Sequence, residues 1–198
     1  MRLNRSTTLA ALLVLSLPLS VARAEDEHRE LGAHVHGHGT LNIAVEKNRV
    51  VMELEAPGMD IVGFEHAARS PEQLAAVSKA KVELAKPLAM FNLPASASCT
   101  VSKAEVELET EHDDDGEDHA EHADEDGDHD EAEAGHTEFH VTYALDCAKP
   151  DNLTSITFAY FTAFAGAKEL TVNVVTAKAQ NTYEVSRDKP TVDLGGMM

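Results

Sequence analysis

Residues 40–57 read TLNIAVEKNRVVMELEAP, and two stretches of alternating apolar and polar residues stand on either side of a short polar break. Residues 40–46 carry an apolar side chain at every second position, and residues 49–57 do the same. Strict alternation is typical of a β-strand with one buried face. Lys47 and Asn48 leave two residues for a turn, so the pattern predicts a β-hairpin.

A second hairpin is expected from residues 99–109 and 138–147, which flank a long acidic segment. In this pairing Cys99 faces Cys147, and a one-residue bulge near Ser102 brings the apolar side chains of both strands onto one face. Further strands are expected at residues 154–161 and 170–178 and, as one or two short pieces, within 183–194.

One long helix is predicted after the first hairpin. Ser70 is a good N-cap, Pro71 suits the first helical position, and Gln73 completes a capping-box pattern. The helix is expected to end near Lys86, because Pro87 follows. These elements predict an α+β fold in which a mostly antiparallel β-sheet packs on one principal α-helix, with a long disordered loop rich in His, Asp and Glu.

That loop is residues 109–138, which contain 16 acidic residues and 5 histidines but no lysine or arginine. The segment has no aromatic or large apolar side chain, so it cannot bury enough surface to offset the entropy lost on ordering. We expect a disordered insert within one domain.

The N-terminus resembles a secretory signal peptide. Arg2 and Arg5 precede an apolar run that is too short to span a membrane, and Ala22-Arg23-Ala24 matches a small-residue cleavage site. Cleavage after Ala24 would leave residues 25–198 as a single exported domain without membrane insertion. The net charge of −19 disfavours nucleic-acid binding and attracts cations, although solubility alone would also explain it.

The chain has two cysteines, Cys99 and Cys147. An even pair in an exported protein predicts a disulfide. A thiolate metal site is the alternative, which oxidising compartments disfavour.

Residues 34–39 read HVHGHG, with His34, His36 and His38 at alternate positions. In an extended segment such residues point to the same face, so two or three imidazoles can converge on one zinc ion. His66 or Glu65 could add a ligand from elsewhere in the chain. The alternative is that the histidines are only solvated.

The remaining histidines offer weaker evidence for metal binding. The insert carries five, which are expected to bind several ions weakly, although a solubilising loop would look similar: His112, His119, His122, His129 and His136. His140, on the strand after the insert, could be a ligand, face solvent or cap the insert. For His66 a hydrogen bond at the helix entry is as reasonable as a ligand role.

The chain resembles the ZrgA family of periplasmic zinc-binding proteins of Gram-negative bacteria over nearly its whole mature length. The resemblance rests on AHVHGHGTLNIAVE, LEAPGMDIVGFEH, LAMFNLPASASC, the His/Asp/Glu insert and EFHVTYALDCAKPDNLTSITFAYFTAFAGAKELTV. It implies zinc binding, a role in zinc acquisition and a Cys99–Cys147 disulfide. By motif position it supports His34, His36, His38 and His66, and the insert histidines as a group.

The predicted function is capture of Zn(II) in the periplasm in support of zinc acquisition. We expect a monomer that passes zinc to an importer or to its periplasmic binding protein. The alternative is storage or detoxification of copper, nickel or zinc, because imidazole sites also bind these metals. An enzyme is not expected: no H-E-x-x-H motif occurs, and Glu65 is the only candidate base near the histidines.

Overall fold

Strand β1 (His38–Glu46) lies inside a six-stranded sheet whose strand order is β4-β5-β2-β1-β7-β8. Only the β1–β7 pair is parallel. The other strands of this sheet are β2 (Arg49–Pro57), β4 (Cys99–Thr110), β5 (Thr137–Cys147), β7 (Glu169–Thr176) and β8 (Gln180–Ser186).

The computed structural model describes residues 35–110 and 135–198, all within one unit of the chain. The predicted signal peptide (1–24) lies outside the described residues. So do residues 111–134 of the predicted insert. Strands β4 and β5 extend to Thr110 and Thr137, so the ends of that predicted insert belong to the sheet.

The first predicted hairpin is confirmed. Strands β1 and β2 pair from Thr40 with Glu55 to Glu46 with Arg49, around a turn in which Lys47 has a positive φ of 55°. The alternating apolar side chains of both strands are buried: Leu41, Ile43, Val45, Val50, Met52, Leu54 and Ala56. Their burial against a second layer is the main stabilisation of this half of the sheet.

The second predicted hairpin is also confirmed, including its bulge. Cys99 faces Cys147, and the register shifts by one residue between Val101 and Lys103, which leaves Ser102 as the extra residue. Beyond the bulge Val106 faces Val141, so the apolar side chains of the two strands lie on the same face of the sheet, where they can be buried together. The two cysteines form a disulfide.

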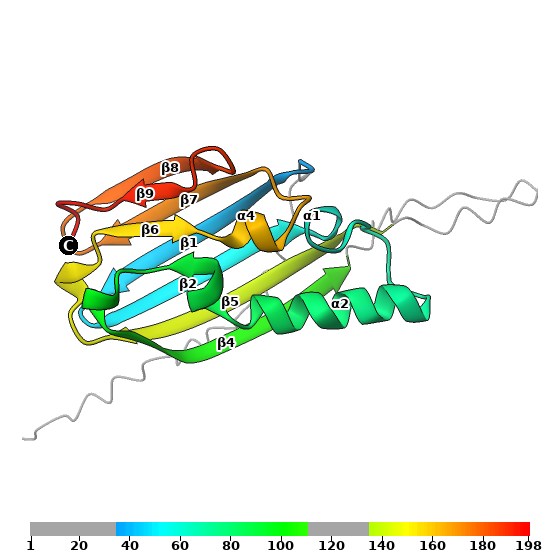
Figure 1. The fold of residues 1–198 in the computed structure, drawn as a ribbon, viewed down its shortest axis with the longest axis horizontal. Coiled ribbons are helices and arrows are strands. Elements are labelled where there is room, and N and C mark those ends of the chain that lie inside the picture. Colours follow the sequence, from blue (N-terminus) through cyan, green and yellow to red (C-terminus); the bar gives the residue numbers. More distant parts are fainter. Residues whose placement is uncertain (1–34, 111–134) are drawn as a thin grey trace, which may run out of the picture. The chain divides into compact units, whose positions relative to one another are not determined.

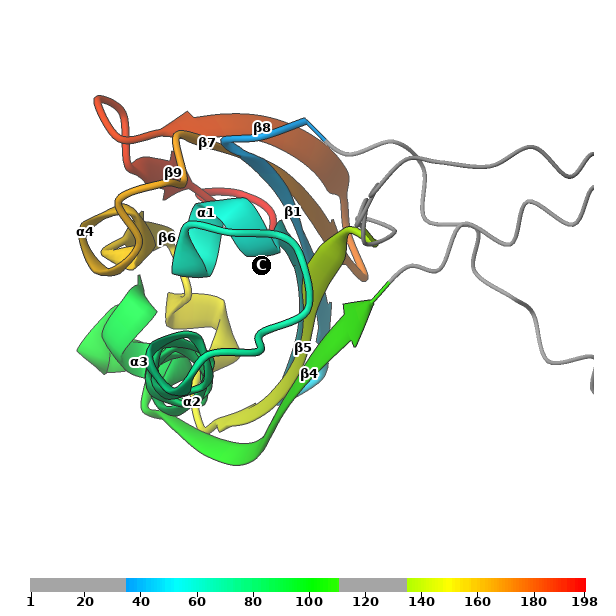
Figure 2. The same ribbon diagram turned by 90° about the vertical axis from the view of Figure 1, so that its right-hand side faces the viewer.

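A second layer covers the inner face of the sheet. Figures 1 and 2 show a smaller sheet and several short helices on one side of the six strands, which curve around them. The small sheet has the order β3-β6-β9, and its strands are Phe91–Asn92, Ser155–Phe158 and Thr191–Asp193. The helices are α1 (Gly58–Val62), α2 (Pro71–Leu84), α3 (Pro87–Met90) and α4 (Tyr160–Ala163), with 3-10 turns at Ala95–Ala97 and Pro150–Asn152.

Aromatic side chains join the two layers. Phe91 contacts Tyr143 of the large sheet and Phe158 and Tyr160 of the second layer. The hydroxyl of Tyr143 donates a hydrogen bond to the carbonyl of Leu84 at 2.8 Å, which satisfies a buried polar atom and fixes the end of α2.

The predicted packing of the sheet on one principal helix is wrong. Of the residues that the structure describes, 47% are in strands and 24% in helices, and the helical residues are divided among several helices. Helix α2 has the predicted capping box at Ser70 and Gln73, but it buries only Ala80 and Leu84 and leaves Leu74 and Val82 exposed. The small sheet and the aromatic side chains occupy the space that the helix was expected to fill.

Replacing both Cys99 and Cys147 by alanine should lower the free energy of unfolding by about 2–4 kcal/mol, because the disulfide closes a long loop in the unfolded chain. The two residues are separated by 48 positions in the sequence. Urea denaturation of the oxidised protein and of the variant checks this expectation. An unchanged free energy of unfolding would contradict it.

Candidate metal centre

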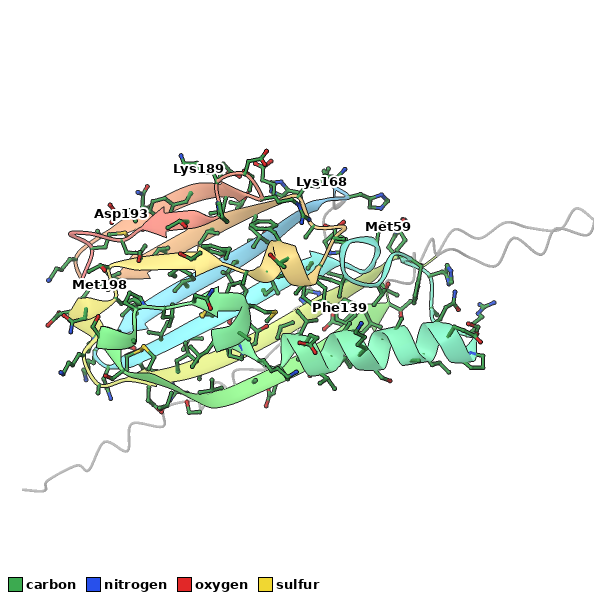
Figure 3. The ribbon with its side chains drawn as sticks, in the orientation of Figure 1. Met59, Phe139, Lys168, Lys189, Asp193 and Met198 are labelled. Carbon is green, nitrogen blue, oxygen red and sulfur yellow. A yellow bond between two sulfur atoms is a disulfide. The ribbon has the colours of Figure 1, made fainter. Side chains whose placement is uncertain are left out.

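The candidate site lies at the end of the large sheet where β1 and β5 begin and β2 ends. Lys168 and Met59, labelled in Figure 3, mark this end. A turn precedes β1, in which the amide of His38 donates to the carbonyl of Val35 at 3.0 Å. This turn carries His36 on one side of Gly37 and His38 on the other.

The backbone of Gly37 is held on both sides. Its amide donates to Oδ1 of Asp60 at 2.6 Å, and its carbonyl accepts from the amides of Lys168 and Glu169, each at 2.9 Å. Gly37 has a φ of +90°, which side-chain-bearing residues rarely adopt. The chain therefore bends sharply between the two histidines.

His36 and His136 meet at one carboxylate oxygen. Nε2 of His36 lies 2.7 Å from Oε2 of Glu65, and Nδ1 of His136 lies 3.1 Å from the same atom. Glu65 follows α1, which ends where the amide of Gly63 donates to the carbonyl of Met59. Three segments far apart in the sequence thus bring two imidazoles and a carboxylate together.

These three side chains are accessible to solvent to different degrees. The exposed fractions are 50% for His36, 44% for His136 and 20% for Glu65. Imidazole nitrogen and carboxylate oxygen are both zinc ligands. In residues 35–110 and 135–198, however, no group of three or more His, Cys, Asp or Glu side chains is arranged so that it could hold a metal ion. His36, Glu65 and His136 therefore lie close together without forming a metal site as they stand.

The other described histidines contact different partners. Nε2 of His38 lies 2.9 Å from Oγ1 of Thr171 on β7. His66 stacks on Phe64, with Nδ1 3.1 Å from the carbonyl of Ala67 and Nε2 3.4 Å from the side chain of Gln73. The same-face expectation for His36 and His38 assumed an extended backbone, which the turn at Gly37 interrupts.

His140 belongs to a separate cluster on the outer face of the sheet. Its Nε2 lies 3.0 Å from Oε2 of Glu138 and 3.6 Å from Oε2 of Glu109, and 12% of its side chain is exposed. The contact with Glu138 is close but does not have the geometry of a full hydrogen bond. This contact raises the pKa of His140, burial opposes the rise, and the charges of Glu138, Glu109 and Glu55 add to it.

The remaining predicted ligands lie outside the described residues: His34, His112, His119, His122 and His129. Asp60 was not among the site residues predicted from the sequence. This residue is an acid inside the apolar stretch APGMDIVGF, and such a position is the sequence feature that could have identified it.

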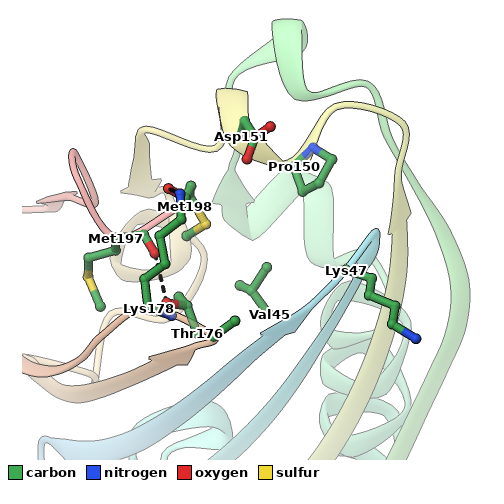
Figure 4. A pocket seen from close by; sticks show the side chains of 9 residues that line it. Val45, Lys47, Pro150, Asp151, Thr176, Lys178, Met197 and Met198 are labelled. Atoms are coloured by element: carbon green, nitrogen blue, oxygen red, sulfur yellow. Dashed lines mark hydrogen bonds between the residues drawn. The ribbon is translucent and has the colours of Figure 1, made fainter.

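A pocket at the opposite end of the sheet has different chemistry. It has a volume of about 170 Å³, and Figure 4 shows Val45, Lys47 and Lys178 among the residues that line it. The Lys178 ammonium donates to the carbonyl of Met198. The ionisable side chains that line it are those of Lys47, Lys178 and Asp151, so cationic side chains outnumber acidic ones and disfavour a divalent cation.

The fold and the cluster define a disulfide-bonded β-sheet protein that gathers imidazole and carboxylate side chains at one end of its main sheet. A family model described as "ZrgA family zinc uptake protein" matches residues 33–194. The chain therefore belongs to the ZrgA family, as its sequence motifs indicated.

A search of curated proteins found no match to this chain. Across residues 35–110 and 135–198, none of the helices combines the length and the apolar character that a membrane crossing needs. The disulfide and the family are compatible with an exported protein.

The charge on His140 should make stability depend on pH. A histidine whose pKa is raised in the folded state stabilises that state fully below its unfolded pKa of about 6.5, and the stabilisation is lost as pH rises through the folded pKa. The free energy of unfolding of the unaltered protein should therefore be higher than that of His140→Gln, and this difference should be larger at pH 5.5 than at pH 8.5. Both proteins are measured with a chelator present. As a control, Glu138→Gln removes the carboxylate that faces His140, so the difference in the free energy of unfolding should vary less with pH in that background. A difference that stays constant with pH would contradict the expectation.

Proposed function

We propose that this protein captures Zn(II) in the periplasm and supports zinc acquisition. We further propose that His36, Glu65 and His136 form the ordered part of its zinc site. The observation that carries this proposal is the convergence of two imidazole nitrogens on one oxygen of Glu65. The family description supports zinc as the ion and uptake as the process.

The geometry of the cluster is compatible with a metal-free form of such a site. Donor atoms of a tetrahedral zinc site lie about 3.3 Å apart, because each stands about 2.0–2.1 Å from the ion. The two nitrogen–oxygen distances are 2.7 and 3.1 Å, shorter than this, so the side chains would have to move apart to admit an ion. In the metal-free form, a proton on Nε2 of His36 can bridge to Glu65, whereas Nδ1 of His136 lies close to the same oxygen without the geometry of a hydrogen bond.

Further ligands are needed to complete this set, because two nitrogens and one carboxylate leave a zinc ion short of four ligands. His34, two residues before His36, remains a predicted ligand. The insert histidines His112, His119, His122 and His129 remain predicted weak ligands that raise the local zinc concentration. The hairpin pairs Thr110 with Thr137, so residues 111–134 are attached next to His136.

The described residues favour different roles for the other candidates. His38 contacts Thr171, and His66 contacts the entry of helix α2, so neither belongs to the ordered part of the proposed site. His140 is proposed to act as an ion-pairing residue at the base of the insert. No catalytic role is proposed, since the family description concerns zinc uptake and names no reaction.

Zinc titrations of residues 25–198 test the ordered site. His36→Ala, Glu65→Gln and His136→Ala should each weaken the tightest zinc affinity roughly 10-fold or more, because each removes a ligand. The matched control His66→Ala, one residue from Glu65, should leave that affinity unchanged.

Replacing residues 111–134 by a short Gly/Ser turn should lower the number of bound ions and leave the tightest site, since the β4–β5 pairs are kept. Loss of all zinc binding in this variant, with the three ligand variants unchanged, would refute the ordered site.

Expression distinguishes acquisition from storage or detoxification. A protein that supports acquisition is needed when zinc is scarce, so its transcript should rise when zinc is chelated and fall when zinc is added. Measurement of transcript levels across a zinc series, with copper and nickel series in parallel, checks this. Induction by excess zinc, copper or nickel would contradict the acquisition role.

A further inference from the structure

Asp60 is a buried acid outside the proposed ligand set. Its exposed fraction is 4%, and it lies on the five-residue helix α1. Burial of a carboxylate is costly unless the group accepts strong hydrogen bonds. Oδ1 of Asp60 accepts from the amide of Gly37 at 2.6 Å, a short bond of the kind that a charged acceptor makes.

This one contact joins the two segments that carry His36 and Glu65. The amide that Asp60 holds follows His36 directly, and Asp60 itself stands five residues before Glu65. Because the carbonyl of Gly37 is bound by the amides of Lys168 and Glu169, the turn is fixed from two directions. A shift of Asp60 would therefore change the separation of the His36 and Glu65 side chains.

Asp60 is itself held in place by the segment that precedes β7. A side chain at Gly166 would put its Cβ 2.5 Å from the carbonyl oxygen of Asp60, so the two backbones are in close contact. The Arg187 guanidinium holds this segment by donating to the carbonyls of Ala165 and Ala167, at 3.1 and 2.7 Å. The carboxylate of Asp60 thus projects from a rigid support.

We infer that Asp60 is a positioning residue for the proposed zinc site, acting through the Gly37 amide to hold His36 against Glu65. The inference rests on the proposed function. In this role Asp60 supplies no ligand to the zinc ion. Its role matches that of groups which orient metal ligands without touching the metal, and whose loss typically costs 10–100-fold in metal affinity.

The test compares Asp60→Ala with Asp60→Asn in residues 25–198, using Zn(II) titration and the visible absorption spectrum of bound Co(II). Asp60→Ala removes the acceptor and should weaken the tightest zinc affinity about 10–100-fold and change the Co(II) spectrum. Asp60→Asn keeps an oxygen that can accept from Gly37, so it should restore most of the affinity and the native spectrum.

Tyr143→Phe is the control for general loss of stability. It removes the buried hydrogen bond to the carbonyl of Leu84, which involves none of Asp60, His36, Glu65 and His136, and should destabilise the protein without changing zinc affinity or the Co(II) spectrum. If Asp60→Ala does not fold, Gly37→Ala replaces it. A Cβ there would meet the Lys168 side chain at 2.9 Å and would disfavour the φ of +90°, so it should produce the same losses.

The positioning inference is overturned if Asp60→Ala, or Gly37→Ala in its place, leaves zinc affinity and the Co(II) spectrum as in Tyr143→Phe. It is equally overturned if Asp60→Asn is as impaired as Asp60→Ala while both remain folded. If His36→Ala and Glu65→Gln weaken the tightest affinity in the same experiment, only the positioning role fails. If these two variants are also without effect, the proposed zinc site itself fails.

Discussion

The pairing of β1 with two neighbours brings the segments of the candidate site to one end of the main sheet. Antiparallel pairing with β2 places the end of β2 beside the start of β1, and parallel pairing with β7 places the start of β7 there as well. Strand β5, antiparallel to β2, also begins at this end. Segments that are separated in the sequence therefore converge at one end of the sheet. There Asp60 holds the turn before β1 from one side, and the chain before β7 holds it from the other.

The β4–β5 hairpin carries the disulfide at one end and the contact between His136 and Glu65 at the other. The disulfide joins the strands at one end, where the described chain is continuous on both sides. At the other end the strands lead to residues 111–134, and His136 contacts Glu65 there. The cross-link therefore lies at the opposite end of the hairpin from the point where residues 111–134 join it.

The two hairpins and the helix cap were predictable from the sequence, whereas the packing of the two layers and the contacts between separate segments were not. The two hairpins, the Ser102 bulge and the Ser70 capping box depend on residues close in sequence or on one face of a strand. The sequence could not show that a small sheet and aromatic side chains cover the inner face, which is why the principal-helix prediction failed. It named Glu65 as a candidate but not its shared contact with His36 and His136, because that contact depends on how β1, β2 and β5 assemble.

The exposure of the proposed ligands bears on the difference between capture and storage. Structural zinc sites are usually closed by four protein ligands. Here the side chains of His36 and His136 are about half exposed, although Nδ1 of His136 is buried, and the described residues do not form a closed site with four ligands. A proposed site of this kind would exchange its ion more readily than a closed one, which suits a protein that must give zinc up. The proposed support from Asp60 matters most in such a site, because with few ligands available the zinc affinity depends on how well those ligands are held in place.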